Sequence, residues 1–372
     1  MNSFALYRLP FGQTVTLVRQ SEGSPRKLEG CRDLNGRSGF VVAPFAVSES
    51  CPHLLISADS VSQFALDDDF GLQLNHSDGF FAVDHEGGSF AVDDEGGSHN
   101  LANRDSYAHD FRVFHDELCA GRFRKLVLSR CCELSLPHSG GIDVDAVEWF
   151  RQACLRYPRL FIALVYTPQS GLWLTATPEI LLEGDDRQWR TIALAGTMPL
   201  PEQPASDAEV AAAARWSAKD IEEQRIVASY IADCLRRFSA DVCECGPRTV
   251  RAAHLLHLRS DFTFTLSPRA GVGDLLQALH PTPAVCGLPK EDAFRFILTH
   301  EHSPRRYYSG FMGPLNLSAT THLYVTLRCM QLSETCCRLY AGGGLLKESS
   351  ELSEWQETEA KLDTMRLLVP HD

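Results

Sequence analysis

Short apolar segments follow one another in the middle of this chain with no helical pattern between them. They cover residues 159–167, 171–177, 180–183 and 189–194. Strands that succeed one another directly tend to pair as antiparallel neighbours, whereas a parallel sheet needs a crossover, usually helical, after each strand. We therefore predict an α+β fold with antiparallel sheets and no domain boundary after about residue 100.

Helical periodicity and further strands surround this run. Apolar residues that recur every three to four positions predict helices, and alternation predicts strands. We predict helices over 105–120, 143–157, 207–239 and 353–368, and strands over 125–130, 324–331 and 337–341.

The first hundred residues are weakly patterned. We expect residues 1–104 to pack on the same domain as a core formed by 105–372. Within them, the segment 81–89 is repeated almost unchanged as 90–98. Two copies are too few for a solenoid. We interpret them as a duplicated surface hairpin or loop with no chemical role.

Composition narrows the classes of function. Hydrophobic residues make up 44% of the chain, enough for a sizeable core, and the net charge of −13 argues against nucleic-acid binding. A pocket for a small anion is still possible, because a few local cations decide its sign. The 13 cysteines form no CxxC pair, so a zinc site is not expected. Without a secretory signal or an apolar stretch of about 18 residues, we expect no membrane segment and a cytoplasmic protein with reduced thiols.

The run Gly342-Gly-Gly344 precedes a predicted helix that carries Glu354, Glu357 and Lys361. These positions are i, i+3 and i+7, so the three side chains share one helical face. Two carboxylates and an ammonium beside a backbone without side chains suit a metal ion and an anionic ligand. A solvated charged face is the alternative.

Two candidate acid–base residues stand at strand ends. Lys125 begins the strand 125–130, and an amine buried on the inner face of a sheet can serve as a base. Glu179 follows a proline and precedes Ile180-Leu-Leu182, and apolar surroundings raise the pKa of a carboxyl group until it can act as an acid. An exposed edge lysine and a turn glutamate are the alternatives.

Glu223 falls on the apolar face of its predicted helix, since Val227, Tyr230 and Cys234 follow at helical spacing. A carboxylate there needs a partner. Mg²⁺, shared with Glu354 or Glu357, would suit it. An ion pair with Arg225 or Lys219 is the alternative.

Three weaker candidates complete the set. Arg328 follows an apolar run and could anchor a buried carboxylate. His257 could line a pocket, although a core histidine is the ordinary interpretation. Leu194, Ala195, Gly196 and Thr197 form a strand end and a small-residue turn that a ligand could approach closely.

Taken in order, these segments resemble the chorismate-binding enzyme family, which includes isochorismate, salicylate, anthranilate and aminodeoxychorismate synthases. The resemblance covers about residues 105–368. The matching segments are Lys125-Leu-Val-Leu-Ser-Arg130, Ala176-Thr-Pro-Glu179, Leu194-Ala-Gly-Thr197, Lys219-Asp-x-x-Glu223, His257-Leu258, His280-Pro-Thr-Pro-Ala-Val285, Arg305-x-x-Tyr308-x-Gly310, Arg328, Gly342-Gly-Gly344 and Glu354-Trp-x-Glu357-x-x-x-Lys361.

The resemblance implies a single large domain, a sandwich of antiparallel sheets surrounded by helices. It implies that Glu223 and Glu357 bind Mg²⁺, with Glu354 close by, and that the metal holds the ring carboxylate of chorismate. The implied substrate-binding groups are Arg328, Lys361, the backbone near Gly342, the turn Leu194–Thr197, and the pocket-lining His257 and Ala284.

It also implies a reaction. A lysine at the position of Lys125 is typical of family members that add water, so Lys125 would be the base and Glu179 the acid of a Mg²⁺-dependent isochorismate synthase, an isomerase. Gln224 stands where many relatives have histidine, and on this basis we favour menaquinone biosynthesis over a siderophore pathway. A salicylate synthase and a non-catalytic chorismate-binding protein are the alternatives. We expect a monomer that needs no glutaminase subunit.

Overall fold

The computed structural model describes residues 3–67, 104–136, 142–200 and 206–369. The duplicated segment 81–98 lies outside these residues. None of the helices that are described is long and apolar enough to cross a membrane.

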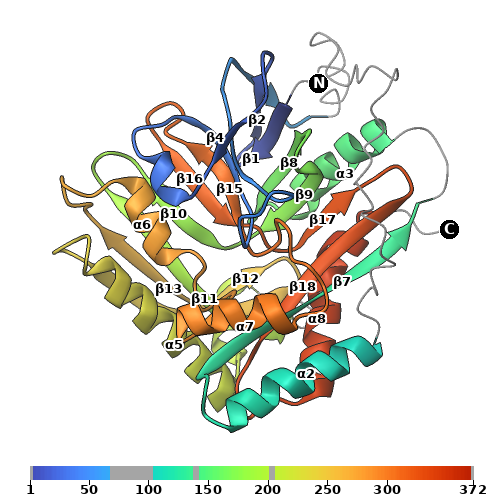
Figure 1. The fold of residues 1–372 in the computed structure, drawn as a ribbon, viewed down its shortest axis with the longest axis vertical. Coiled ribbons are helices and arrows are strands. Elements are labelled where there is room, and N and C mark those ends of the chain that lie inside the picture. Colours follow the sequence, from blue (N-terminus) through green and yellow to red (C-terminus); the bar gives the residue numbers. More distant parts are fainter. Residues whose placement is uncertain (1–2, 68–103, 137–141, 201–205, 370–372) are drawn as a thin grey trace.

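Two antiparallel sheets of nine strands each form the centre of the molecule (Figure 1). In spatial order, the first sheet contains β14 (Gly287–Leu288), β7 (Lys125–Ser135), β18 (Cys336–Leu345), β17 (Cys329–Leu332), β9 (Gly171–Thr177), β8 (Phe161–Thr167), β1 (Ser3–Arg8), β2 (Thr14–Gln20) and β6 (Ser60–Ala65). The second contains β12 (Cys243–Ala252), β13 (Leu255–Phe264), β11 (Trp189–Pro199), β10 (Ile180–Gly184), β16 (Thr321–Val325), β15 (Phe311–Leu315), β4 (Gly39–Ala43), β5 (His53–Ile56) and β3 (Arg26–Leu28).

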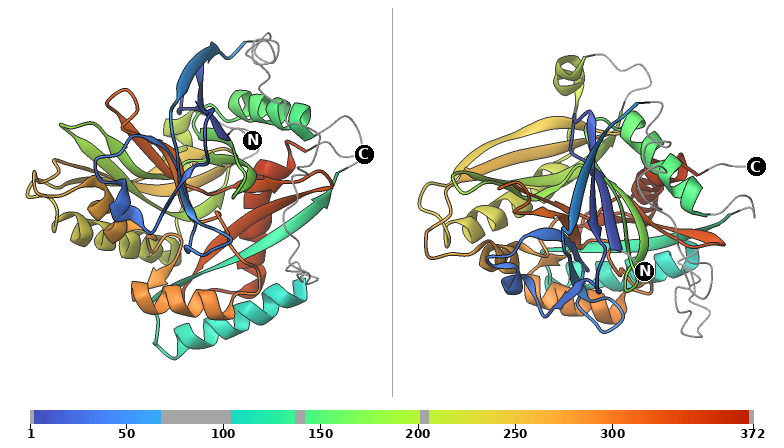
Figure 2. Two further views of the ribbon diagram at one scale, coloured as in Figure 1. Left: turned by 45° about the horizontal axis from the view of Figure 1, so that its top comes forward. Right: turned by 90° about the horizontal axis from the view of Figure 1, so that it is seen from above.

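Helices cover the outer faces of both sheets (Figure 2). α3 and α8 pack on the first sheet, and α5 and α6 pack on the second. α2 and α7 enclose a smaller core around β7. The described helices are α2 (Arg104–Cys119), α3 (Ile142–Arg156), α4 (Asp207–Ala213), α5 (Ala218–Leu235), α6 (Val272–Leu279), α7 (Lys290–His300), α8 (Glu351–Arg366) and the short 3₁₀ helix η1 (Cys31–Leu34).

Strand β8 shows why the sheets are layered in this way. Phe161, Ala163 and Val165 point into the core between the two sheets, whereas Ile162 and Leu164 point into the core under α3. Successive side chains of a strand face opposite sides, so a strand that is apolar at every position must be covered on both faces. The continuous apolar run of β8 therefore requires a sheet on one side and a helix on the other.

The prediction of an α+β fold with antiparallel sheets is confirmed, but two predicted elements are interrupted. The helical region 207–239 is divided into α4 and α5 because Ser217 begins a new helix, its hydroxyl accepting a hydrogen bond from the Asp220 backbone amide (3.1 Å). The predicted strand 324–331 is broken at Arg328, whose φ of 46° is incompatible with a continuous strand.

Candidate active site

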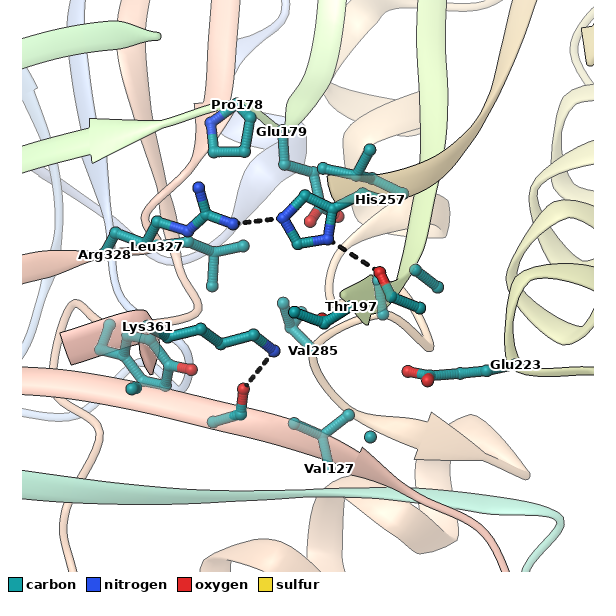
Figure 3. Close-up of a pocket in the computed structure, with 18 residues that line it drawn as sticks. Val127, Pro178, Glu179, Thr197, Glu223, His257, Val285, Leu327, Arg328 and Lys361 are labelled. Carbon is teal, nitrogen blue, oxygen red and sulfur yellow. Dashed lines mark hydrogen bonds between the residues drawn. The ribbon is translucent and has the colours of Figure 1, made fainter. Parts of the chain in front are cut away.

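A cavity lies where both sheets meet α5 and α8, and Figure 3 shows the residues around it. Eleven of the fourteen predicted site residues line it: Glu179, Leu194, Ala195, Gly196, Thr197, Glu223, His257, Ala284, Arg328, Gly342 and Lys361. The other three do not line the cavity. Lys125 contacts the lining residue Glu223, Glu357 contacts the lining residue Lys361, and Glu354 lies beside Gly343, between the lining residues Gly342 and Gly344.

Glu179 is presented to the cavity by the turn between β9 and β10 and is 4% exposed. Burial raises the pKa of its carboxyl group to about 7, even though Lys125, Lys361 and Arg328 act in the opposite direction. A carboxyl group with this pKa is protonated in a substantial fraction of molecules at neutral pH, so it can donate a proton.

Arg328 and His257 form one hydrogen-bonded unit on the cavity wall (Figure 3). The Nδ1 atom of His257 is 2.8 Å from the Gly196 carbonyl, which can only accept, so Nδ1 carries the proton. The other ring nitrogen then accepts from the Arg328 guanidinium. Burial lowers the pKa of His257 well below its usual value, and Arg328 lowers it further, so the ring is neutral. This unit fixes the guanidinium beside the turn at Gly196.

Lys125 and Glu223 form a buried pair at another part of the site. Lys125, on β7, is 0% exposed, and its Nζ lies 3.0 Å from Glu223 Oε1 on α5. Burial would raise the pKa of Glu223, but Lys125 and Lys219 hold it below its usual value. The alternative interpretation, an ion pair of Glu223 with Arg225 or Lys219, is not what the structure has, because the side chain instead pairs with Lys125 on β7.

The glycine run on β18 makes room for these side chains. A Cβ atom on Gly344 would overlap Glu223 Oε1 and would lie 2.9 Å from Lys125 Cε. On Gly343 a Cβ atom would lie 3.1 Å from Glu354 Oε2 and 3.6 Å from Glu357 Oε1. The acidic side chains therefore occupy the space that side chains at these positions would fill.

Helix α8 brings two more carboxylates to the glycine run. Glu357 pairs with Lys361 (2.7 Å), whose Nζ also donates to the Gly342 carbonyl (2.9 Å). Glu354 pairs with Lys219, and its Oε2 atom is buried without a hydrogen-bond partner. Burial, and then the charge of Glu357, raise the pKa of Glu354 to about 7.

The carboxylates of Glu223, Glu354 and Glu357 are of the ligand type that a hard divalent cation binds. Oxygen ligands are what Mg²⁺ prefers, and the unpartnered oxygen of Glu354 has unused acceptor capacity. In the part of the chain that the structure describes, no three acidic, histidine or cysteine side chains converge as a complete metal site, because a lysine holds each carboxylate. Glu223, Glu354 and Glu357 thus offer suitable oxygen ligands for the metal. To bind it, each carboxylate would have to give up its ion pair with a lysine.

The sequence interpretation missed part of the lining. The additional residues are Val127, Pro178, Val285, Tyr308, Leu327, Ala341 and Gly344. Most of them lie inside or next to the sequence motifs already noted. Each motif therefore contributes more residues to the cavity wall than the sequence interpretation assigned to it. Gln224 is buried and donates hydrogen bonds to Ala193 (3.2 Å) and Ser260 (3.3 Å), and it is not among the lining residues.

Arg305 connects two segments of the cavity wall by hydrogen bonds. Its guanidinium donates to the carbonyls of Val127 (2.8 Å) and Val285 (2.6 Å), which belong to different segments of the lining. Glu301 accepts from Arg305 and also from the Ser129 backbone amide (2.6 Å). This buried ion pair therefore sets the distance between β7 and the segment before α7.

Comparisons with known proteins agree with the motifs. The family model described as chorismate binding enzyme matches residues 90–369. The chain is 37% identical to isochorismate synthase DhbC of Bacillus subtilis over 66% of this chain and 63% of that protein. It is 30% identical to isochorismate synthase MenF of Escherichia coli over 68% and 57%, respectively. The matched regions thus span less than two thirds of these relatives.

A solved structure shares the fold. The structure of MenF, described as the menaquinone-specific isochorismate synthase from Escherichia coli, superposes with a TM-score of 0.76 over 99% of this chain and 89% of that chain, at 20% sequence identity. The superposition covers both sheets, and the family match includes every residue assigned to the site. On these grounds the chain belongs to the chorismate-binding enzyme family.

Proposed function

We propose that this protein is an isochorismate synthase that adds water at C2 of chorismate and releases the C4 hydroxyl. The observation that carries the proposal is that both the candidate acid and the candidate base are buried at this site. Glu179, with a pKa of about 7, lines the cavity, and Lys125 contacts Glu223, which also lines it. A protein that only binds its ligand needs no such pair. The relatives DhbC and MenF are both named isochorismate synthases, which supports the same reaction.

Two cations would hold the substrate. Arg328 and Lys361 line the cavity, and chorismate carries two carboxylates that guanidinium and ammonium groups can bind. Glu223 lies on the far side of the cavity from Arg328 (Figure 3). Glu223, Glu354 and Glu357 would hold Mg²⁺ there, which when bound would offset the charge of the ring carboxylate.

The proposed reaction needs two proton transfers, one to the base and one from the acid. To act as the base, Lys125 would have to give up its ion pair with Glu223 and, as the free amine, would take a proton from the attacking water as the oxygen bonds to C2. The ring double bond shifts, and the C4 hydroxyl leaves as water with a proton from Glu179. One water enters and one leaves, so the product is an isomer of chorismate. The neutral His257 keeps Arg328 oriented during these steps.

The pathway remains a prediction. Gln224 led us to favour menaquinone biosynthesis, and MenF is one of the relatives. DhbC is the more similar of these two relatives, at 37% identity against 30% for MenF. Complementation of host strains that lack either type of isochorismate synthase would test the assignment, since growth of only the menaquinone-deficient strain is expected.

The test of the reaction is product analysis. We expect the purified protein, incubated with chorismate and Mg²⁺, to yield isochorismate and no pyruvate by chromatography with mass detection. Salicylate together with pyruvate would instead identify a salicylate synthase. Unchanged chorismate that is nevertheless bound would identify a non-catalytic member of the family.

A further inference from the structure

A second cavity, of about 300 Å³, lies beside the candidate active site. Four arginines line it, Arg159, Arg248, Arg251 and Arg259, and Asp207 is the one carboxylate among its described lining residues. Its volume is at the lower end of the roughly 300–1,000 Å³ that small-molecule sites occupy. Such a concentration of guanidinium groups stands out in a chain with a net charge of −13.

The positive charges around this cavity are only partly neutralised. Arg159 pairs with Asp207 (2.7 Å), and Arg248 and Arg259 share the single carboxylate of Asp261. Arg251 donates only to the Ala253 carbonyl (3.3 Å), with no carboxylate within ion-pair distance among the described residues. Among the described residues, four guanidinium groups are therefore paired with two carboxylates, which leaves an excess of two positive charges.

A single layer of residues separates this cavity from the candidate active site. Pro178 and Leu194 line both cavities. Ala252 lines the arginine-rich cavity, and its carbonyl lies 3.5 Å from the guanidinium of Arg328, which lines the other. An anion in the arginine-rich cavity would therefore lie next to the groups that we propose bind substrate carboxylates.

We infer that the arginine-rich cavity is a vestibule, an encounter site that holds the dianionic substrate beside the active site and raises its concentration there. The inference rests on the proposed function, because that function makes the ligand a dicarboxylate. An acidic protein repels such a ligand on average, and a cleft with positive walls and low-dielectric surroundings raises its local concentration. Guanidinium groups also bind carboxylates in a fork geometry that suits a first encounter.

The test compares two double variants that remove the same charge. Arg248→Gln with Arg251→Gln removes two charges from the vestibule. Arg236→Gln with Arg295→Gln removes two from exposed ion pairs on the helical surface, outside the described cavities. For each double variant, kcat and kcat/KM for chorismate would be measured at low ionic strength and in 0.5 M NaCl.

We expect the vestibule variant to lose about three- to tenfold in kcat/KM at low ionic strength, a part of the roughly 10–10³-fold that steering by a whole charged cleft contributes, with kcat within about twofold of the parent. The loss should disappear in high salt, where the Debye length falls to a few ångströms. A kcat/KM equal to that of the surface variant, a parallel fall in kcat, or a loss that persists in high salt would each overturn the inference.

The activity of the unmodified protein distinguishes a failure of this inference from a failure of the proposed function on which it rests. If the parent makes no isochorismate, the proposed function fails, and the vestibule inference fails with it. If the parent is active and only the comparison of variants fails, the proposed function stands and the vestibule inference alone is overturned.

Discussion

Three ammonium groups neutralise three carboxylates in and beside the candidate active site. Each carboxylate is wholly or partly removed from water, where an unpaired charge would be costly. The lysines therefore stabilise the acidic side chains that we propose as metal ligands, and the base and the metal site share one group, Glu223. The pairs are Lys125 with Glu223, Lys219 with Glu354, and Lys361 with Glu357.

The role of Lys125 is tested by its removal. We expect Lys125→Ala to lower kcat at least about 10²-fold, the lower end of what a general base contributes, while Mg²⁺-dependent chorismate binding survives in calorimetry. Losing one partner of a buried ion pair costs about 3–5 kcal/mol, so thermal unfolding must be followed as well. Lys125→Gln keeps most of the volume as a second variant, and Lys347→Ala, at an exposed position, is the control. Near-normal turnover in a folded variant would show that Lys125 is not the base.

The raised pKa of Glu179 predicts a pH dependence. A general acid works in its protonated form, so activity should fall as the pH rises through about 7. We expect Glu179→Gln to lower kcat strongly and to remove this alkaline limb from the pH profile of kcat. Glu354 has a pKa of about 7 as well, but a metal ligand works in its ionised form, so its titration would raise activity with pH. A fall at alkaline pH that persists in Glu179→Gln would show that Glu179 is not the acid.

At the scale of single elements, strand β18 and helix α8 together form one wall of the site. β18 supplies backbone without side chains, and α8, packed against it, supplies Glu354, Glu357 and Lys361. Neither element forms this part of the site alone, because the missing side chains of the glycines matter only where the acidic side chains of α8 pack over them.

A methyl group on β18 should disturb the site locally. In Gly344→Ala the added Cβ atom would meet Glu223 Oε1 and Lys125 Cε, so we expect at least a tenfold loss of kcat/KM and a weaker response to Mg²⁺. The matched control is Gly30→Ala, where the nearest atom is the flexible end of Gln277 at 3.3 Å. Equal activity of both variants in steady-state assays would mean that the close approach at Gly344 has no functional value.

Helix α8 also allows a test of the metal assignment. We expect Glu357→Gln to raise the Mg²⁺ concentration that gives half-maximal activity at least about tenfold, because an anionic ligand is lost. Glu351→Gln, in the first turn of the same helix and paired with Arg104, should leave the titration unchanged. An unaltered Mg²⁺ titration of Glu357→Gln would remove this residue from the metal site.

Local pattern was enough to predict some of these features and not others. The burial of Glu223 follows from helical spacing and is confirmed by its 8% exposure. Its partner Lys125 could not be found that way, because α5 and β7 meet only through the tertiary fold. Strands β12 and β13 were not predicted. β12 is largely exposed and includes Gly246-Pro247, so it lacks the apolar alternation by which strands are recognised.

At the scale of the whole molecule, the N-terminal strands take part in both sheets. β1 pairs with β8 in the first sheet, and β4 pairs with β15 in the second. These contacts agree with our proposal that residues 1–104 pack on the same domain as the core. Without them, β8 and β15 would become edge strands with one side unpaired, which promotes aggregation.

Truncation tests this proposal. We expect a chain that begins at residue 104 to be insoluble, or to lack the cooperative unfolding transition of the full chain in urea followed by circular dichroism. A soluble fragment with a cooperative transition and native-like near-ultraviolet signal would show that residues 104–372 form an independent domain.

The pairing of distant strands also determines when this protein can first become complete during its synthesis. Ala43 can pair with its partner only after Phe311 has been synthesised, and Leu126 only after Leu345 has been synthesised. At about 5–20 residues per second, the earlier strands remain without their neighbours on the ribosome for on the order of 10–60 s. Chaperones that shield exposed strand edges should therefore matter more for its yield than for that of a chain folding from local contacts. Because Lys361 follows β18, the last strand that the structure describes, the proposed active site can be complete only after residue 361 has been synthesised.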